Sequence, residues 1–164
     1  MENEAKKLWS KQEWDGLIAF VDGDHSAFSS RLIRYASIAD QQAEVSAYMA
    51  ETLELPFSDS LLRMIDLRGM SDVEVYKAAK VDRRVFSKIR SSSDYQPSRG
   101  TAIRLCLALH MTALEAMVLL EKAGYALSHS KKGDIVIEYC MDHGIFDVEK
   151  VNEALLQLNL EGIL

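Results

Sequence analysis

The 164-residue sequence lacks several features that would place it in particular classes of protein. It has no run of about eighteen apolar residues, so no segment is predicted to span a membrane. The N-terminal stretch MENEAKKLWSKQEWDG has no apolar signal core, which favours a cytoplasmic location. Two prolines and two cysteines are present. Cys106 and Cys140 fall on apolar faces of helical patterns, so both are expected to be buried, reduced thiols.

Patterns that would indicate catalysis or metal binding are also missing. The four histidines are widely spaced, and none lies in a nucleophile or metal-binding motif. Cys140 and His143, three residues apart, could supply two zinc ligands, but the sequence offers no second pair at ligand spacing. There is no glycine-rich phosphate loop. The sequence therefore predicts a protein that is not an enzyme and that holds neither a metal nor a cofactor.

Charge is plentiful but unevenly distributed. Residues 60–104 contain ten Lys and Arg against five Asp and Glu, a net charge of +5. Residues 1–59 carry −6 and residues 105–164 carry −5, so the whole chain is at −6. A basic middle between acidic ends is expected when one surface meets phosphates, although helical proteins also scatter charge by chance.

Apolar periodicity predicts an all-α protein. Ser10 and Glu13 form a capping box that starts the first helix. Residues 26–53 continue as one long helix, or as two with a break at Asp40. The apolar stripe of this segment is rich in alanine and suits either a core or a dimer surface.

Five further helices are expected over residues 57–125, with Ser58 as the cap of the first and Thr112 in a capping box before the last. Two more helices are expected beyond them. In the first of these, Ile135–Cys140 is β-branched enough for a strand, but the spacing of apolar residues and the stop at Gly144 favour a helix.

The most informative stretch is SDVEVYKAAKVDRRVFSKIRS, residues 71–91, which predicts two short helices joined by a tight turn. The apolar side of the first helix is expected to comprise Val73, Val75, Ala78 and Ala79. Asp82 can cap the second helix, whose inward face holds Val85, Phe86 and Ile89. The residues left for solvent or for an anion are Arg83, Arg84, Ser87, Lys88 and Arg90.

This pattern resembles the phage-repressor-like helix-turn-helix domain (Cro/C1-type, XRE family), whose usual form is T-Q-x-x-L-A-x-x-x-G-V-x-x-x-x-I-S-x-I. The residues on matching positions are Ser71, Asp72, Val75, Val81, Phe86, Ser87 and Ile89. Tyr76 replaces a small alanine of the family, and Lys80 replaces the turn glycine. Lys80 must therefore adopt the left-handed conformation or use a different turn. The resemblance covers about residues 57–125 and implies a five-helix repressor-like fold.

The resemblance also implies a function, because the second helix of the motif reads the major groove of duplex DNA. The expected DNA-binding residues are Arg83, Arg84, Ser87, Lys88, Arg90 and Arg99. Arg83 and Arg84 would reach base edges, whereas Arg90 and Arg99 would contact the phosphate backbone from exposed positions. Such a protein would be a bacterial transcriptional regulator, and half-site reading implies a homodimer.

Three segments are expected: an N-terminal helical extension at 1–55 that supplies an oligomer or protein-partner contact, the helix-turn-helix domain at 56–126, and a helical extension at 127–164 packed on it. The last resembles the tail of a group of bacterial helix-turn-helix proteins. The alternative function is a non-enzymatic interaction module or adaptor with acidic flanks, since fold does not fix function. Asp72, which would repel phosphate, favours this alternative. RNA binding is a lesser third hypothesis, because no aromatic stacking platform is evident.

Overall fold

The computed structural model describes residues 8–23 and 55–164, and every regular element in these two ranges is an α-helix. The helices are α1 (Lys11–Val21), α4 (Phe57–Leu67), α5 (Asp72–Ala78), α6 (Arg83–Ser91), α7 (Arg99–Ala108), α8 (Ala113–Lys122), α9 (Lys132–Asp142) and α10 (Val148–Gln157). The predicted all-α class is confirmed for these residues. The helical pattern at 26–53 and its break at Asp40 lie outside them.

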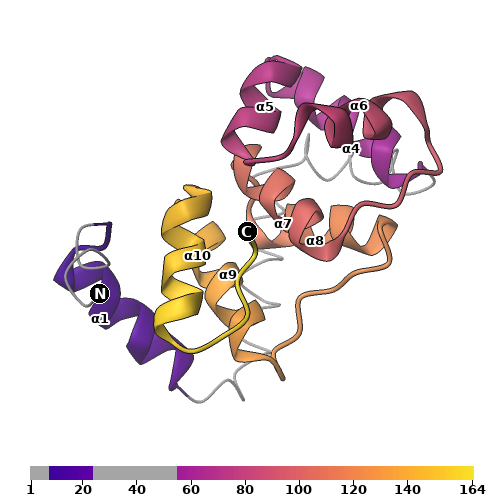
Figure 1. Ribbon diagram of the computed structural model, residues 1–164. Helices are drawn as coiled ribbons and strands as arrows, with labels where there is room; N and C mark the ends of the chain where they lie inside the picture. The colour runs from indigo at the N-terminus through magenta and orange to yellow at the C-terminus, as the bar shows by residue number, and fades with distance from the viewer. Residues whose placement is uncertain (1–7, 24–54) are drawn as a thin grey trace.

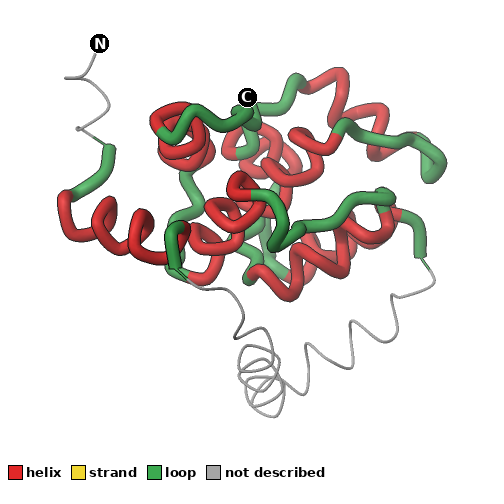
Figure 2. The backbone as a smooth tube through the Cα atoms, turned by 90° about the horizontal axis from the view of Figure 1, so that it is seen from below, coloured by secondary structure: helices red, strands yellow, loops and turns green. Residues whose placement is uncertain are grey.

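The helices form an elongated molecule with α1 at one end and α4, α5 and α6 at the other (Figures 1 and 2). Helix α7 lies between the two ends and packs against α5, α8 and α10. Its residues from 101 to 108 are buried except for Arg104. A single hydrophobic core therefore runs from the α5–α6 pair through α7 to the C-terminal helices.

Side chains at the helix starts explain where most helices begin. Ser10, Ser71 and Thr112 each form a capping box with a glutamate three residues later. The expected cap at Ser58 is wrong, because Pro56, two residues earlier, stands at the cap position and α4 begins at Phe57. Proline suits a position at the edge of a helix because it fixes its own φ and lacks an N–H. Ser58 is instead buried in the first turn, and its hydroxyl donates to the Ser92 carbonyl at 3.3 Å.

Several helices end on a residue in the left-handed conformation. Gly69, Gly124 and Gly144 do so at negligible steric cost, whereas Lys80 adopts a φ of 53°. The Lys80 N–H donates to Lys77 O at 3.1 Å, and the Val81 N–H donates to Tyr76 O at 2.9 Å. This pair of bonds is the Schellman motif, which satisfies the last carbonyls of α5. Of the two turns open to Lys80, the chain therefore uses the left-handed one.

Helix α1 belongs to the core at the end opposite α6. It packs against α9, with Leu17 and Val21 buried. Just before it, Trp9 Nε1 donates to the Lys150 carbonyl at 2.9 Å, and Lys150 Nζ lies 2.8 Å from a Glu13 carboxylate oxygen. The oligomer or partner contact expected of residues 1–55 stays a prediction, and much of that segment lies outside the described residues.

Helix α9 confirms the helical assignment of Ile135–Cys140, and it is buried from Asp134 to Met141. Its apolar residues are continuous rather than alternating because α1, α8 and α10 all pack around it. Cys140, like Cys106 on α7, is a buried free thiol, and burial raises the pKa of Cys140 to about 12. Within the described ranges, no helix combines the length and apolar character needed to cross a lipid bilayer.

Candidate nucleic-acid interface

Helices α5 and α6 are held together by a small apolar cluster. Its buried members are Val75 from α5, Ala79 at the C-cap of α5, Val81 from the turn, and Phe86 and Ile89 from α6. Val73 was expected on the same face but is 46% exposed, and Ala78 is exposed as well. At about 100° per residue, Val73 lies about 200° around the helix from the buried Val75, and Ala78 lies about 60° from it, at the edge of the buried face.

Tyr76 adds a ring contact where the resembled family has a small residue. Its ring is half-buried and its centroid lies 5.8 Å from that of Phe86, at an interplanar angle of 51°. A tilted arrangement at this distance is favourable for aromatic pairs. The larger side chain is thus accommodated as packing between α5 and α6.

The turn between the two helices is fixed from two other helices. Arg104 of α7 donates through Nη1 to the Lys80 carbonyl at 2.7 Å, and through Nη2 to Thr101 Oγ1 at 3.3 Å. In addition, Glu149 of α10 forms an ion pair with Lys80, with Lys80 Nζ 2.9 Å from its carboxylate oxygen. The backbone that leads into α6 is therefore held by one charged hydrogen bond and one surface ion pair.

Helix α6 presents a cationic face on the outside of this packed unit. Asp82 caps it by accepting from the Arg84 N–H at 2.7 Å. All five residues expected to face solvent are exposed: Arg83, Arg84, Ser87, Lys88 and Arg90. Within the part of the chain that the structure describes, Arg83, Arg84 and Lys88 make no ion pair. These three cations are therefore available to an anionic ligand.

Arg90 differs from its neighbours because it is paired inside the α5–α6 unit. Its guanidinium lies 2.9 Å from the carboxylate of Asp72. The charge of Asp72, which would repel a phosphate, is thus balanced by Arg90. The sequence had instead predicted that Arg90 contacts the phosphate backbone of DNA. An Arg90 contact with phosphate would require this exposed pair to exchange partners.

Arg99 is not the exposed phosphate anchor that was expected. Its side chain is 36% exposed, and it lies 2.5 Å from Asp134, whose side chain is 5% exposed. It also donates to the carbonyl of Ala126 at 3.3 Å. The expectation failed because α9, which lies outside the resembled segment, supplies the carboxylate that binds Arg99.

A buried polar layer beneath the loop at residues 126–131 was missed at the level of sequence. Asp134 accepts from the Ser128 N–H at 2.8 Å, and Glu138 lies 2.6 Å from His129 Nε2. Both carboxylates are almost fully buried on α9. The detectable signal was two acidic residues four apart in the stretch from Asp134 to Met141, which is otherwise apolar. The layer fixes the loop against α9.

The histidine and cysteine on α9 are not arranged as ligands. The ring of His143 stacks on Tyr139 with centroids 3.8 Å apart, and its Nδ1 lies 2.8 Å from the Tyr139 carbonyl oxygen. Over residues 8–23 and 55–164, no group of three or more His, Cys, Asp or Glu is placed to hold a metal ion.

Comparison of the chain with protein-family models, with curated proteins and with solved structures returned no match. Over residues 8–23 and 55–164 the fold defines an all-α protein, and α6 carries its exposed cationic surface.

Proposed function

We propose that residues 57–125 form a repressor-like helix-turn-helix domain that binds duplex DNA through α6, and that the chain is a bacterial transcriptional regulator. The observation that carries the proposal is the construction of α6. Phe86 and Ile89 anchor its inner face, while Arg83, Arg84 and Lys88 are exposed on the outside. A short helix of this kind fits the width of the major groove.

The proposed contacts follow from positions along α6. Arg83 and Arg84, in its first turn, would reach base edges, where arginine bonds the two acceptors of guanine. Ser87 and Lys88, one turn later, would contact base or phosphate. Arg99 leaves the set because Asp134 already binds it. A homodimer would present two copies of α6 to half-sites one helical turn apart.

The interaction module is the second candidate, and one observation favours it. Leu67 and Val73 are 61% and 46% exposed on either side of Gly69. Both belong to helices of the proposed domain and are six residues apart in the sequence, and exposed large apolar side chains suit a protein contact. On this hypothesis the α5–α6 pair is a scaffold, and Leu67 and Val73 meet a partner.

A binding titration with matched variants tests the proposal. Duplexes selected from a random pool would be titrated at several salt concentrations with the unmutated chain and with R83Q/R84Q. Selective binding should be lost in the variant, because each bidentate arginine–guanine contact contributes roughly 1–3 kcal/mol of discrimination.

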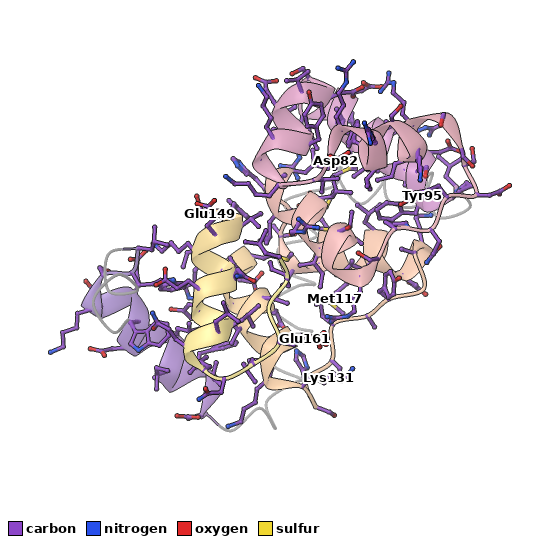
Figure 3. The ribbon with its side chains drawn as sticks, viewed as in Figure 1. Asp82, Tyr95, Met117, Lys131, Glu149 and Glu161 are labelled. Atoms are coloured by element: carbon purple, nitrogen blue, oxygen red, sulfur yellow. The ribbon has the colours of Figure 1, made fainter. Side chains whose placement is uncertain are left out.

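The matched control is K131Q/K132Q, which removes the same charge from the start of α9. Figure 3 places Lys131 well away from Asp82 and the start of α6. This control should keep its selectivity. If the unmutated chain shows no saturable binding to any duplex near physiological salt, the regulator hypothesis fails and the interaction module replaces it.

A further inference from the structure

The ion pair between Lys80 and Glu149 joins the proposed DNA-binding unit to the C-terminal extension. Lys80 precedes α6 by three residues, and Glu149 lies in the first turn of α10. Their charged atoms are 2.9 Å apart, although the two residues are 69 positions apart in the chain. Figure 3 shows Glu149 at the end of α10 that faces the α5–α6 pair.

The N-terminal end of α10, which contains Glu149, is also attached to the N-terminal segment of the chain. Lys150, the residue after Glu149, lies 2.8 Å from Glu13 and its ammonium nitrogen is 5.0 Å from the centre of the Trp9 ring. Asp147 caps α10 by accepting from the Lys150 N–H at 2.8 Å. Consecutive residues of a helix point about 100° apart. Glu149 and Lys150 therefore attach the same helix end to two different parts of the molecule.

The Lys80–Glu149 pair is well placed for exchange. The two side chains are 49% and 57% exposed, and exposed pairs of this kind add little to stability and are screened by salt. Glu149 raises the pKa of Lys80, chiefly by accepting its hydrogen bond, and Asp147 adds to the effect by its charge. Lys80 is thus a fully charged cation held by a replaceable anion.

The charged groups around the turn act on an approaching phosphate in two opposite ways. Arg83 and Arg84 attract phosphate at the start of α6, and Lys80 would add a third cation beside them. The carboxylates of Asp147 and Glu149 act in the opposite sense, since both interact with the charge of Lys80. A phosphate that binds Lys80 competes with Glu149 for the charge of the ammonium group.

We propose that Lys80 is an additional phosphate contact of the α6 surface and that Glu149 restrains DNA binding by competing for it. This inference rests on the proposed function. It makes α10 an intramolecular inhibitor of the surface, with one carboxylate standing where a DNA phosphate would bind.

The test compares E149Q with E161Q, which removes the same charge from an exposed position that Figure 3 places farther from Asp82 and α6. Duplex affinity would be measured for the full chain from 50 to 300 mM salt, with circular dichroism to confirm folding. E149Q should bind about threefold or more tightly at low salt. Its plot of log K against log salt should be steeper by about 0.9, since one more phosphate contact releases one more counterion.

A second pair of variants assigns the effect to Lys80. In a K80Q background, E149Q should no longer tighten binding, because there is no cation to release. The inference is overturned if E149Q binds no more tightly than E161Q while the unmutated chain binds duplex. If neither the unmutated chain nor E149Q binds duplex at any salt concentration, both the proposed function and this inference are wrong. Binding by E149Q alone would indicate that the restraint is strong.

Discussion

Lys80 has a φ of 53°, a backbone conformation in which any residue other than glycine is strained by its Cβ. The conformation is imposed by its surroundings. The Schellman bonds at the end of α5 require it, and Arg104 fixes the Lys80 carbonyl. Lys80 therefore carries backbone strain that lowers the stability of the folded chain. The size of this strain can be measured by comparing two substitutions that both remove the ammonium group.

K80G and K80A each lose the ion pair with Glu149, so they differ only in the backbone. Glycine accepts the left-handed conformation freely, whereas alanine does not. We expect K80G to melt roughly 2–4 °C above K80A, because this strain is about 1 kcal/mol and the chain has 164 residues. The measurement is thermal unfolding followed by circular dichroism. Equal melting temperatures would show that the turn relaxes out of the left-handed region in K80A.

Glu13 provides a prediction of pH dependence at the other end of the molecule. The hydrogen bond from Lys150, followed by those from Ser10, lowers the pKa of Glu13 from 4.5 to about 2. A lowered pKa in the folded state stabilises the protein above the unfolded value of 4.5, and this stabilisation is lost as the pH falls towards 2. Because the Glu13 side chain is 38% exposed, solvent screening limits the contribution to at most about 1 kcal/mol.

The variant E13Q isolates this contribution because glutamine can also complete the capping box with Ser10. At pH 7, E13Q should be less stable than the unmutated chain, and the difference should shrink steadily between pH 5 and pH 2. Thermal unfolding at a series of pH values checks it. A difference that stays constant with pH would mean that the Glu13 charge does not stabilise α1 on α10.

At the scale of the helices, α9 connects the proposed domain to the C-terminal extension through charge as well as apolar packing. Its buried Asp134 binds Arg99 at the start of α7 and the N–H of Ser128 in the preceding loop. A buried carboxylate is stable only while it is paired and hydrogen-bonded. We therefore expect Arg99 to contribute to the docking of α9.

Replacing Arg99 should therefore unfold the protein more readily. R99M leaves Asp134 buried and uncompensated, and should cost about 3 kcal/mol, near the lower end for such pairs because Arg99 is partly exposed. In R99M/D134N the asparagine can still accept from Ser128 without a charge, so part of the loss should be recovered. Urea denaturation of the three proteins measures both effects. If R99M is as stable as the unmutated chain, Asp134 is being satisfied by another group.

At the scale of the whole molecule, α10 connects the two ends. Lys150 binds the N-terminal segment through Glu13, and Glu149 binds the turn before α6. The core is continuous between these contacts. A displacement of α10 would thus alter both its contact with the N-terminal segment and the Lys80–Glu149 ion pair beside the proposed DNA-binding surface.

Local features of the sequence were sufficient to predict that the described elements are helices, although the cap at Ser58 was wrong. Capping residues such as Ser10, Asp82 and Thr112, together with apolar spacing, predicted the helices, because caps and periodicity act within a few residues. The same spacing predicted that Phe86 and Ile89 face inward and that Arg83 and Arg84 face outward. A cationic helix joined to a short partner helix was therefore predictable from the chain itself.

The tertiary structure decided which charges remain available. Arg83, Arg90 and Arg99 look equivalent in the sequence, but Arg90 is bound by Asp72 and Arg99 by Asp134. These carboxylates lie 18 and 35 residues away from their partners. No local pattern encodes an ion pair between distant residues, because its formation depends on how whole helices pack. For the same reason only the folded chain shows that Glu149 binds Lys80.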